Sequence, residues 1–212
     1  MIKNSDYYSA VRKEILPLLP ARASRVLDVG CGHGSTGSFL KSEQKADFVA
    51  GIEIVPEAAQ EAKKVLDDVA LLNLDQSKAL PFPEQSFDLI LCLDVLEHLV
   101  DPWQALKLLT KYLKPGGAMI ISLPNVRNFR VVLPLLLQGT FQYSDSGLLD
   151  STHLRFFTKK SSLELAAYSG LQIELVENTG RKTGSITWIA NLLTLGIFRE
   201  FFDIQYLIRV KK

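Results

Sequence analysis

The stretch VLDVGCGHG, residues 26–34, decides the fold of this chain of 212 residues. The apolar run at 25–30 predicts a buried strand that ends in glycine, and residues 35–42 behind it predict a short helix. Glycines at positions 30, 32 and 34 let the backbone approach a ligand closely, and the start of a helix offers backbone N–H groups. The stretch therefore predicts a strand, a tight turn that faces a ligand, and a helix.

Further apolar runs predict four more strands, at 48–54, 69–74, 87–93 and 118–123. Segments with helical spacing separate them. One begins at Pro56 and runs to about residue 68, and another begins at Pro102 behind the capping residue Asp101. Continuous apolar runs are typical of strands that are buried on both faces. Strands that alternate with helices in this way predict a doubly wound α/β fold with a mostly parallel sheet.

Glu53 ends the second predicted strand, 21 residues beyond Gly32. A carboxylate at this place can accept hydrogen bonds from both hydroxyls of a ribose, because it is an acceptor-only group. Residues 32–37 also match GxGxxG, the pattern of nicotinamide and flavin sites. In that pattern the first glycine follows the strand directly, whereas Gly30 and Cys31 intervene here. The sequence therefore favours an adenosine-binding crevice, with a dinucleotide site as the alternative.

The last third of the chain departs from this alternation. Residues 124–157 predict a long connection, followed by a helix at 158–170. Strands are expected at 171–177 and 204–210, with an apolar helix at 186–202 between them. Two strands so close together late in an α/β chain predict an edge pair with one antiparallel member.

Five segments, in this order and spacing, resemble the class I S-adenosylmethionine-dependent methyltransferases: VLDVGCGHG (26–34), GIEI (51–54), LNLDQ (72–76), LPFPEQSFDLILCLDVLEHLVDP (80–102) and LKPGG (113–117). The resemblance implies a seven-stranded, mostly parallel sheet, with S-adenosylmethionine over the carboxyl ends of the strands and S-adenosylhomocysteine as the product. It also implies a single methyltransferase domain over residues 1–212. Within it, 25–123 would form the cofactor-binding core, 124–157 a substrate cap after the fifth strand, and 158–212 the C-terminal helices and edge strands.

The same resemblance assigns the residues expected to bind the cofactor: Asp28, Gly30, Cys31, Gly32, Gly34, Glu53, Ile54, Asp75, Gln76, Leu93 and Asp94. The three glycines would contact the methionine part, with Asp28 supporting their loop. Glu53 would hold the ribose, and Asp75 the adenine amino group. The end of the fourth strand, at Leu93 and Asp94, would lie near the amino-acid moiety.

The second half contains SLPN (122–125) and LDSTHLRFFT (149–158), which are similar to methyltransferases that accompany enzymes of bacterial surface-polysaccharide synthesis. The first half is shared equally with methyltransferases of quinone precursors. The resemblance thus favours a small-molecule, saccharide or lipid-linked acceptor that is methylated on oxygen, with nitrogen or carbon as the alternative atoms.

Two histidines are the candidate catalytic residues. His153 can act as a general base, because a neutral imidazole can take the proton from a hydroxyl; the alternative is a histidine that holds its loop by hydrogen bonds. His98, after the fourth strand, is the second candidate. No metal is expected, since His33, His98 and His153 are the only histidines and have no organised spacing.

Composition narrows the function further. The net charge of +1 argues against a protein that binds nucleic acid through bulk charge. Two cysteines and an N-terminus without the apolar core of a signal peptide favour a cytoplasmic protein. Residues 186–198 are too few to span a bilayer, which takes about 20 residues, but 186–202 could contact a membrane surface or a second copy of the chain. A nicotinamide-dependent oxidoreductase and a non-catalytic S-adenosylmethionine-binding protein are the alternative functions.

Overall fold

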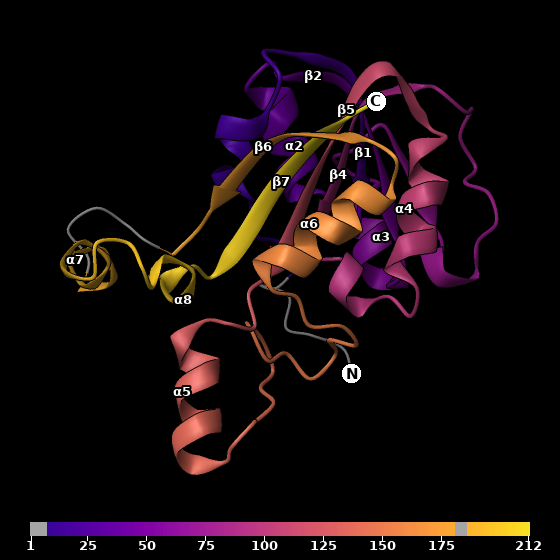
Figure 1. The fold of residues 1–212 in the computed structure, drawn as a ribbon. Coiled ribbons are helices and arrows are strands. Elements are labelled where there is room, and N and C mark those ends of the chain that lie inside the picture. The colour runs from indigo at the N-terminus through magenta and orange to yellow at the C-terminus, as the bar shows by residue number, and fades with distance from the viewer. Residues whose placement is uncertain (1–7, 181–185) are drawn as a thin grey trace.

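The computed structural model describes residues 8–180 and 186–212. Its centre is a seven-stranded sheet in the order β3-β2-β1-β4-β5-β7-β6 (Figure 1). The strands are β1 (Ala23–Val29), β2 (Ala46–Glu53), β3 (Asp68–Leu71), β4 (Phe87–Leu93), β5 (Leu113–Pro124), β6 (Gln172–Asn178) and β7 (Gln205–Lys211). The first five strands are parallel, and β7 pairs antiparallel with both β5 and β6. The predicted fold class, including the edge pair with one antiparallel member, is confirmed.

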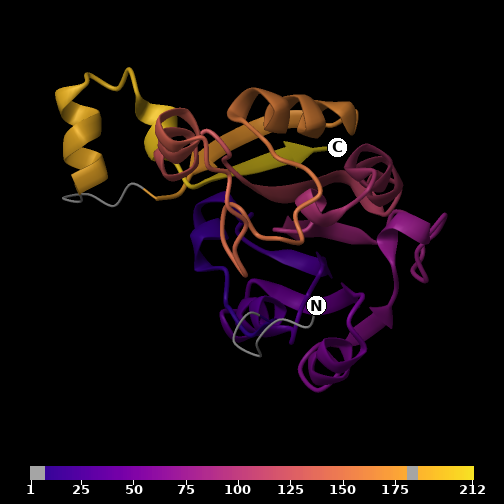
Figure 2. The same ribbon diagram turned by 90° about the horizontal axis from the view of Figure 1, so that it is seen from below.

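Helices cover both faces of this sheet, and others project beyond it (Figure 1). They are η1 (Lys13–Leu18), α2 (Ser35–Ser42), α3 (Pro56–Ala62), η2 (Leu74–Gln76), η3 (Leu96–His98), α4 (Pro102–Thr110), α5 (Phe129–Gln138), α6 (Lys159–Tyr168), α7 (Ile186–Leu193) and α8 (Arg199–Phe202), where η marks a 3-10 helix. The helices α4 and α6 contact each other on one face, and η1, α2 and α3 pack on the other. Figure 2 shows the sheet between these two layers.

Two apolar cores form because successive residues of a strand point to opposite faces. Leu27 and Ile52 belong to the core beneath α4 and α6, whereas Val26 and Val49 belong to the core beneath α2 and α3. All four side chains are at most 2% exposed. Burial on both faces explains why the strands are continuous apolar runs in the sequence.

The strand order reverses beside β1, which pairs with β2 on one side and with β4 on the other. The chain that leaves β1 therefore runs in the opposite direction along the sheet from the chain that leaves β4, and a crevice opens between them. The glycine loop at 30–34, Glu53 at the end of β2 and Asp94 after β4 all lie at this edge of the sheet. The parallel sheet thus brings the predicted site residues together at the carboxyl ends of its strands.

The helices of the last third differ from the prediction. The connection 124–157 contains α5, which projects away from the sheet (Figure 1). The single helix expected at 186–202 is instead two helices, α7 and α8. Between them Leu195 and Gly196 take positive φ angles of 49° and 76°, and left-handed residues end a right-handed helix. The helix after β2 is also shorter than expected, ending at Ala62.

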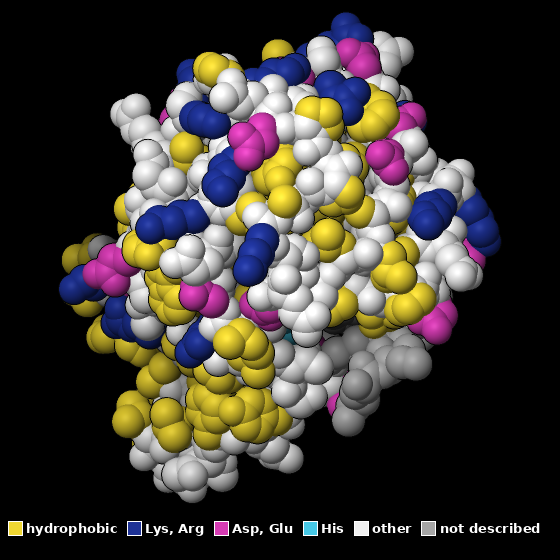
Figure 3. Space-filling view, turned by 90° about the vertical axis from the view of Figure 1, so that its right-hand side faces the viewer, with side chains coloured by type: hydrophobic (Ala, Val, Ile, Leu, Met, Phe, Trp, Pro, Cys, Tyr) yellow, Lys and Arg dark blue, Asp and Glu magenta, His cyan; other side chains and the backbone are white. Residues whose placement is uncertain are grey.

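None of the described helices is long and apolar enough to cross a membrane. Large apolar side chains are nevertheless exposed on α5 and α7, among them Leu136, Leu137, Leu192 and Leu193. Figure 3 shows hydrophobic side chains gathered at the lower end of the molecule, where α5 lies. The expected contact of residues 186–202 with a membrane surface or a second copy stays a prediction, as does the cytoplasmic location.

Candidate active site

The glycine loop folds back on the end of β2. The N–H groups of Gly30 and Cys31 both donate to the last-but-one carbonyl of β2, at 2.7 and 3.1 Å, and the N–H of Gly32 donates to Glu53 Oε2 at 2.9 Å. Gly30 and Gly32 have φ angles of 69° and 55°, which other residues rarely adopt. A Cβ on Gly32 would also lie 2.6 Å from the carbonyl oxygen of Tyr8. Glycine is therefore required both by the turn and by the close approach of the N-terminal segment.

Glu53 is a buried carboxylate that its own surroundings hold in place. It is 5% exposed, and besides Gly32 it receives the N–H groups of Ile54 and Val55 on Oε1, at 2.8 and 2.9 Å. A carboxylate has about four acceptor positions, so Oε2 keeps capacity for another donor. The chemistry of this fixed acceptor fits the hydroxyl of a ribose.

Asp28 and Cys31 lie buried close to Glu53. Burial and then the Glu53 charge raise the pKa of Asp28 to about 7, against the opposing effect of Arg12. Burial also raises the pKa of the Cys31 thiol, and the two carboxylates add to that shift. The thiol stays protonated at neutral pH, which argues against a thiolate nucleophile here.

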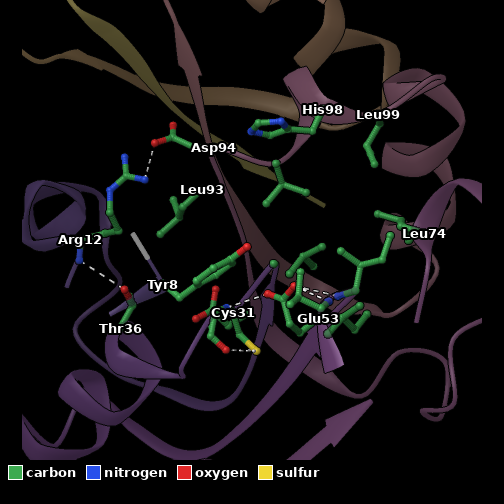
Figure 4. A pocket seen from close by; sticks show the side chains of 18 of the residues that line it. Tyr8, Arg12, Cys31, Thr36, Glu53, Leu74, Leu93, Asp94, His98 and Leu99 are labelled. Atoms are coloured by element: carbon green, nitrogen blue, oxygen red, sulfur yellow. Dashed lines mark hydrogen bonds and ion pairs between the residues drawn. The ribbon is translucent and has the colours of Figure 1, made fainter. Parts of the chain in front are cut away.

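A cavity of about 710 Å³ opens at the carboxyl ends of the strands (Figure 4). This volume is typical of small-molecule and cofactor sites. Most of the residues predicted to bind the cofactor line it: Asp28, Gly30, Cys31, Gly32, Glu53, Ile54, Asp75, Leu93 and Asp94. Figure 4 shows Glu53 and Cys31 on one side of the cavity and Asp94 and His98 on the opposite side.

Two predicted residues, Gly34 and Gln76, do not line this cavity. Gly34 precedes α2, and a Cβ there would lie 2.8 Å from the side chain of Val65, so this glycine allows α2 to pack closely against the segment after α3. Gln76 is exposed. Asp75 lines the cavity, but its carboxylate also accepts the N–H of Val100 at 3.0 Å and so ties η2 to the start of α4.

Asp94 follows β4 with a φ of 56°, a strained value for a residue with a side chain. Three side chains hold its carboxylate: Arg12 at 2.6 Å, Ser122 at 2.6 Å and Gln205 at 2.8 Å. Arg12 and Gln205 were not predicted as site residues from the sequence, because a single arginine before η1 and a glutamine in an edge strand belong to no motif. Together these donors neutralise Asp94 and fix one wall of the cavity.

The two candidate catalytic histidines meet beside Glu97. The ring centroids of His98 and His153 are 4.8 Å apart, and His153 Nε2 lies 3.9 Å from Glu97 Oε1. Burial raises the pKa of the Glu97 carboxyl well above its usual range. Burial, and then the neighbouring His98, lower the pKa of His153, so its imidazole is neutral at pH 7.

A second cavity, of about 100 Å³, contains Glu97, Asp150 and His153 in its lining. Asp94 and Gln205 line both cavities, so the two adjoin at this wall. The smaller cavity thus lies on the side of the larger one that is opposite to Glu53.

Backbone hydrogen bonds bring His153 to this place. The N–H groups of Leu154 and Arg155 both donate to the backbone carbonyl of Glu97, at 2.8 and 3.0 Å. The sequence argument against a metal was that the histidines have no organised spacing. In the structure, however, His98 and His153 lie side by side, so this argument does not hold. Among the described residues, one potential ligand atom from each of Glu97, His98 and His153 lies within 4.8 Å of the others. The Glu-His pair after β4 was the only sequence signal for this cluster.

The doubly wound sheet, the glycine loop and the acid at the end of β2 define an S-adenosylmethionine-dependent methyltransferase of class I. The family described as "Methyltransferase domain" matches residues 4–176, and the chain belongs to it. This membership decides against the nicotinamide-dependent oxidoreductase.

Individual relatives agree with this family. The chain is 30% identical over 181 residues to the ubiquinone biosynthesis O-methyltransferase of Xylella fastidiosa, covering 78% of this chain and 71% of that protein. It is 31% identical over 111 residues to the 27-O-demethylrifamycin SV methyltransferase of Amycolatopsis mediterranei, covering 50% of this chain and 40% of that protein. The structure of a SAM-dependent methyltransferase from Archaeoglobus fulgidus superposes with a TM-score of 0.67 at 19% identity, over 99% of this chain and 95% of that one, and so shares the fold.

Proposed function

We propose that this methyltransferase transfers the methyl group of S-adenosylmethionine to a hydroxyl oxygen of a small molecule or saccharide. One observation carries the proposal. Opposite Glu53, the large cavity meets a smaller one that contains a neutral histidine beside a buried carboxylate. A neutral hydroxyl is a weak nucleophile and benefits from a proton acceptor near the reacting methyl group. The two curated relatives described above, whose names specify oxygen as the methylated atom, support the same choice.

In this proposal the large cavity holds the cofactor. Glu53 would accept the ribose hydroxyls and Asp75 the adenine amino group, while the backbone of 30–32, supported by Asp28, would face the methionine part. The apolar side chains of Leu74 and Leu99, which also line the cavity, suit the faces of an adenine ring. When bound, the cofactor supplies a methyl group that is already activated on a sulfonium sulfur. The task of the protein is therefore chiefly to align acceptor and methyl group.

The smaller cavity would receive the reacting hydroxyl of the acceptor. His153 has a neutral imidazole whose Nδ1 has no hydrogen-bond partner among the described residues, so it can take up the hydroxyl proton. Its neighbour His98 has Nδ1 3.1 Å from the Thr152 carbonyl, which orients the ring at the border of the two cavities. The oxygens of Asp94 are less accessible to an acceptor hydroxyl, because Arg12 and two neutral donors already hold them.

The connection 124–157 would act as the cap that selects the acceptor. It supplies Asp150 and His153 to the smaller cavity, and its helix α5 exposes several leucines. A lipid-linked or otherwise apolar acceptor would suit this surface. Nucleic acid is not expected as a partner, given the net charge of +1.

Two assays test the proposal. In a thermal-shift panel, S-adenosylmethionine and S-adenosylhomocysteine should raise the melting temperature, whereas NADH and NADPH should not. Incubation with isotopically labelled S-adenosylmethionine and a fractionated lysate should then label a small molecule through an alkali-stable methyl ether. Stabilisation by NADH alone would overturn the cofactor assignment. Cofactor binding without turnover of any acceptor would favour the non-catalytic alternative.

A further inference from the structure

Glu97 is a buried carboxylate without a partner. The residue is 0% exposed, and neither side-chain oxygen has a hydrogen-bond partner among the described residues. Among the residues that the structure describes, the only cationic candidate within 4.0 Å of it is His153, whose Nε2 is 3.9 Å away. An isolated charge in the protein interior is strongly unfavourable, so such a group holds a proton, is paired or coordinates a metal. Both oxygens of Glu97 are therefore available to a cation that takes the place of this proton.

The two histidines complete a set of metal-ligand type. One ligand atom each from Glu97, His98 and His153 lie within 4.8 Å of one another. Ligand atoms at about 2.0–2.1 Å from a tetrahedral ion stand about 3.4 Å apart, so side-chain rotations that move each atom by less than about 1 Å would close the set. Two imidazoles and one carboxylate are a donor set of catalytic zinc sites, which keep a fourth position open.

The surroundings of His98 also match those of a metal ligand. The Nδ1 atom lies 3.1 Å from both the carbonyl and the hydroxyl of Thr152, and that hydroxyl donates to Asp150 Oδ1 at 2.7 Å. Metal-bound histidines usually have their second ring nitrogen held by a carbonyl or carboxylate in this way. With Nδ1 engaged in this contact, Nε2 is the ring nitrogen that would bind the cation.

We propose that Glu97, His98 and His153 bind a divalent cation of the zinc type, with a coordination position left for a hydroxyl of the methyl acceptor. The inference rests on the proposed function, because it gives the acceptor its place in the smaller cavity. A hydroxyl bound to such a cation ionises at lower pH and can release its proton to solvent. His153 then serves as a ligand, and the cation takes over the activation that a free imidazole would otherwise provide.

Calorimetric titration of the chelator-stripped full chain with Zn²⁺ tests the proposal. We expect one site per chain, and at least a tenfold loss of affinity in both Glu97→Gln and His98→Ala. His33→Ala is the matched control. This third histidine lies in the glycine loop, away from the cluster, and stacks on Tyr8, so its loss should leave Zn²⁺ affinity unchanged. Absorption of the Co²⁺-substituted wild-type chain gives a second readout, with visible bands of a four-coordinate site expected.

The outcomes separate this proposal from the proposed function. Absence of a stoichiometric site in the wild-type chain, or equal Zn²⁺ affinity in the wild type and both cluster variants, would overturn the metal site. The Co²⁺ spectrum of the wild type decides the matter even where a variant fails to fold. Binding of S-adenosylhomocysteine to the stripped chain is measured in parallel: its retention with no metal site leaves the methyltransferase proposal standing, and its absence refutes the cofactor site itself.

Discussion

Replacing Glu53 by alanine should weaken the binding of S-adenosylhomocysteine. The change removes the acceptor oxygen that faces the large cavity, and a hydrogen bond to a charged group contributes about 1.5–3 kcal/mol. Since each 1.4 kcal/mol is about a tenfold change, the dissociation constant should rise by about 10- to 150-fold. The same change frees the three N–H groups of Gly32, Ile54 and Val55 that Glu53 now holds, so the free protein should also lose stability.

Isothermal titration calorimetry at a temperature below the melting transition measures this effect, with circular dichroism to confirm that the variant is folded. Glu53→Gln is the companion variant, because it keeps the shape of the side chain and removes the charge. Asp75→Ala serves as the comparison and should have a smaller effect, since Asp75 is exposed and also bonds the backbone of Val100. A larger loss in Asp75→Ala than in Glu53→Ala would refute the reasoning, because the adenosine would then not lie where Glu53 holds its ribose.

Three further predictions concern the same two cavities. Gly32→Val should abolish S-adenosylhomocysteine binding, because φ is 55° and the new Cβ would lie 2.6 Å from the Tyr8 carbonyl; unchanged affinity in a folded variant would contradict this. His153→Ala should lower kcat by about 10²–10⁴ with nearly unchanged S-adenosylhomocysteine affinity, and a kcat within about threefold of wild type from pH 6 to 9 would exclude the role. With its pKa raised to about 7, native Asp28 holds a proton that the unfolded chain loses above about pH 4, so the free energy of unfolding should fall from pH 4 to 7. In Asp28→Asn that slope in urea titrations should flatten, and an unaltered slope would show that Asp28 is not the group responsible.

The side of the site around the glycine loop was predictable because local patterns encode it. Continuous apolar runs fix the parallel strands, and the alternate glycines fix the turn after β1. Once these are placed, the parallel order puts Glu53 and Asp94 at one edge of the sheet. The positive φ angles of Gly30 and Gly32 are the physical reason that this signal is visible in the sequence at all.

The cluster around Glu97 was not predictable in the same way. Glu97 and His153 lie far apart in the chain, and backbone donors at Leu154 and Arg155 bring them together. Backbone hydrogen bonds do not depend on the type of side chain. The sequence could therefore suggest each histidine as a candidate, but it could not predict that the two lie in contact. Similarly, the apolar stretch at 186–202 was predicted to form one helix, because nothing in its composition required Leu195 to take a left-handed conformation.

The acids around the two cavities differ in how many hydrogen-bond donors they already have, and this difference supports a separate role for each. Glu53 is held by backbone N–H groups, and Asp94 by Arg12 and two neutral side chains, so both are fixed acceptors whose charge is already compensated. Glu97 alone among these three has neither oxygen engaged, and it stands beside His153 at the far side of the cavity from Glu53. Unsatisfied polar groups in a buried site are costly unless a ligand, a proton or a cation completes them. We therefore propose that the reaction takes place beside Glu97, and that Glu53 and Asp94, which their own donors hold in place, position the molecule that reacts there.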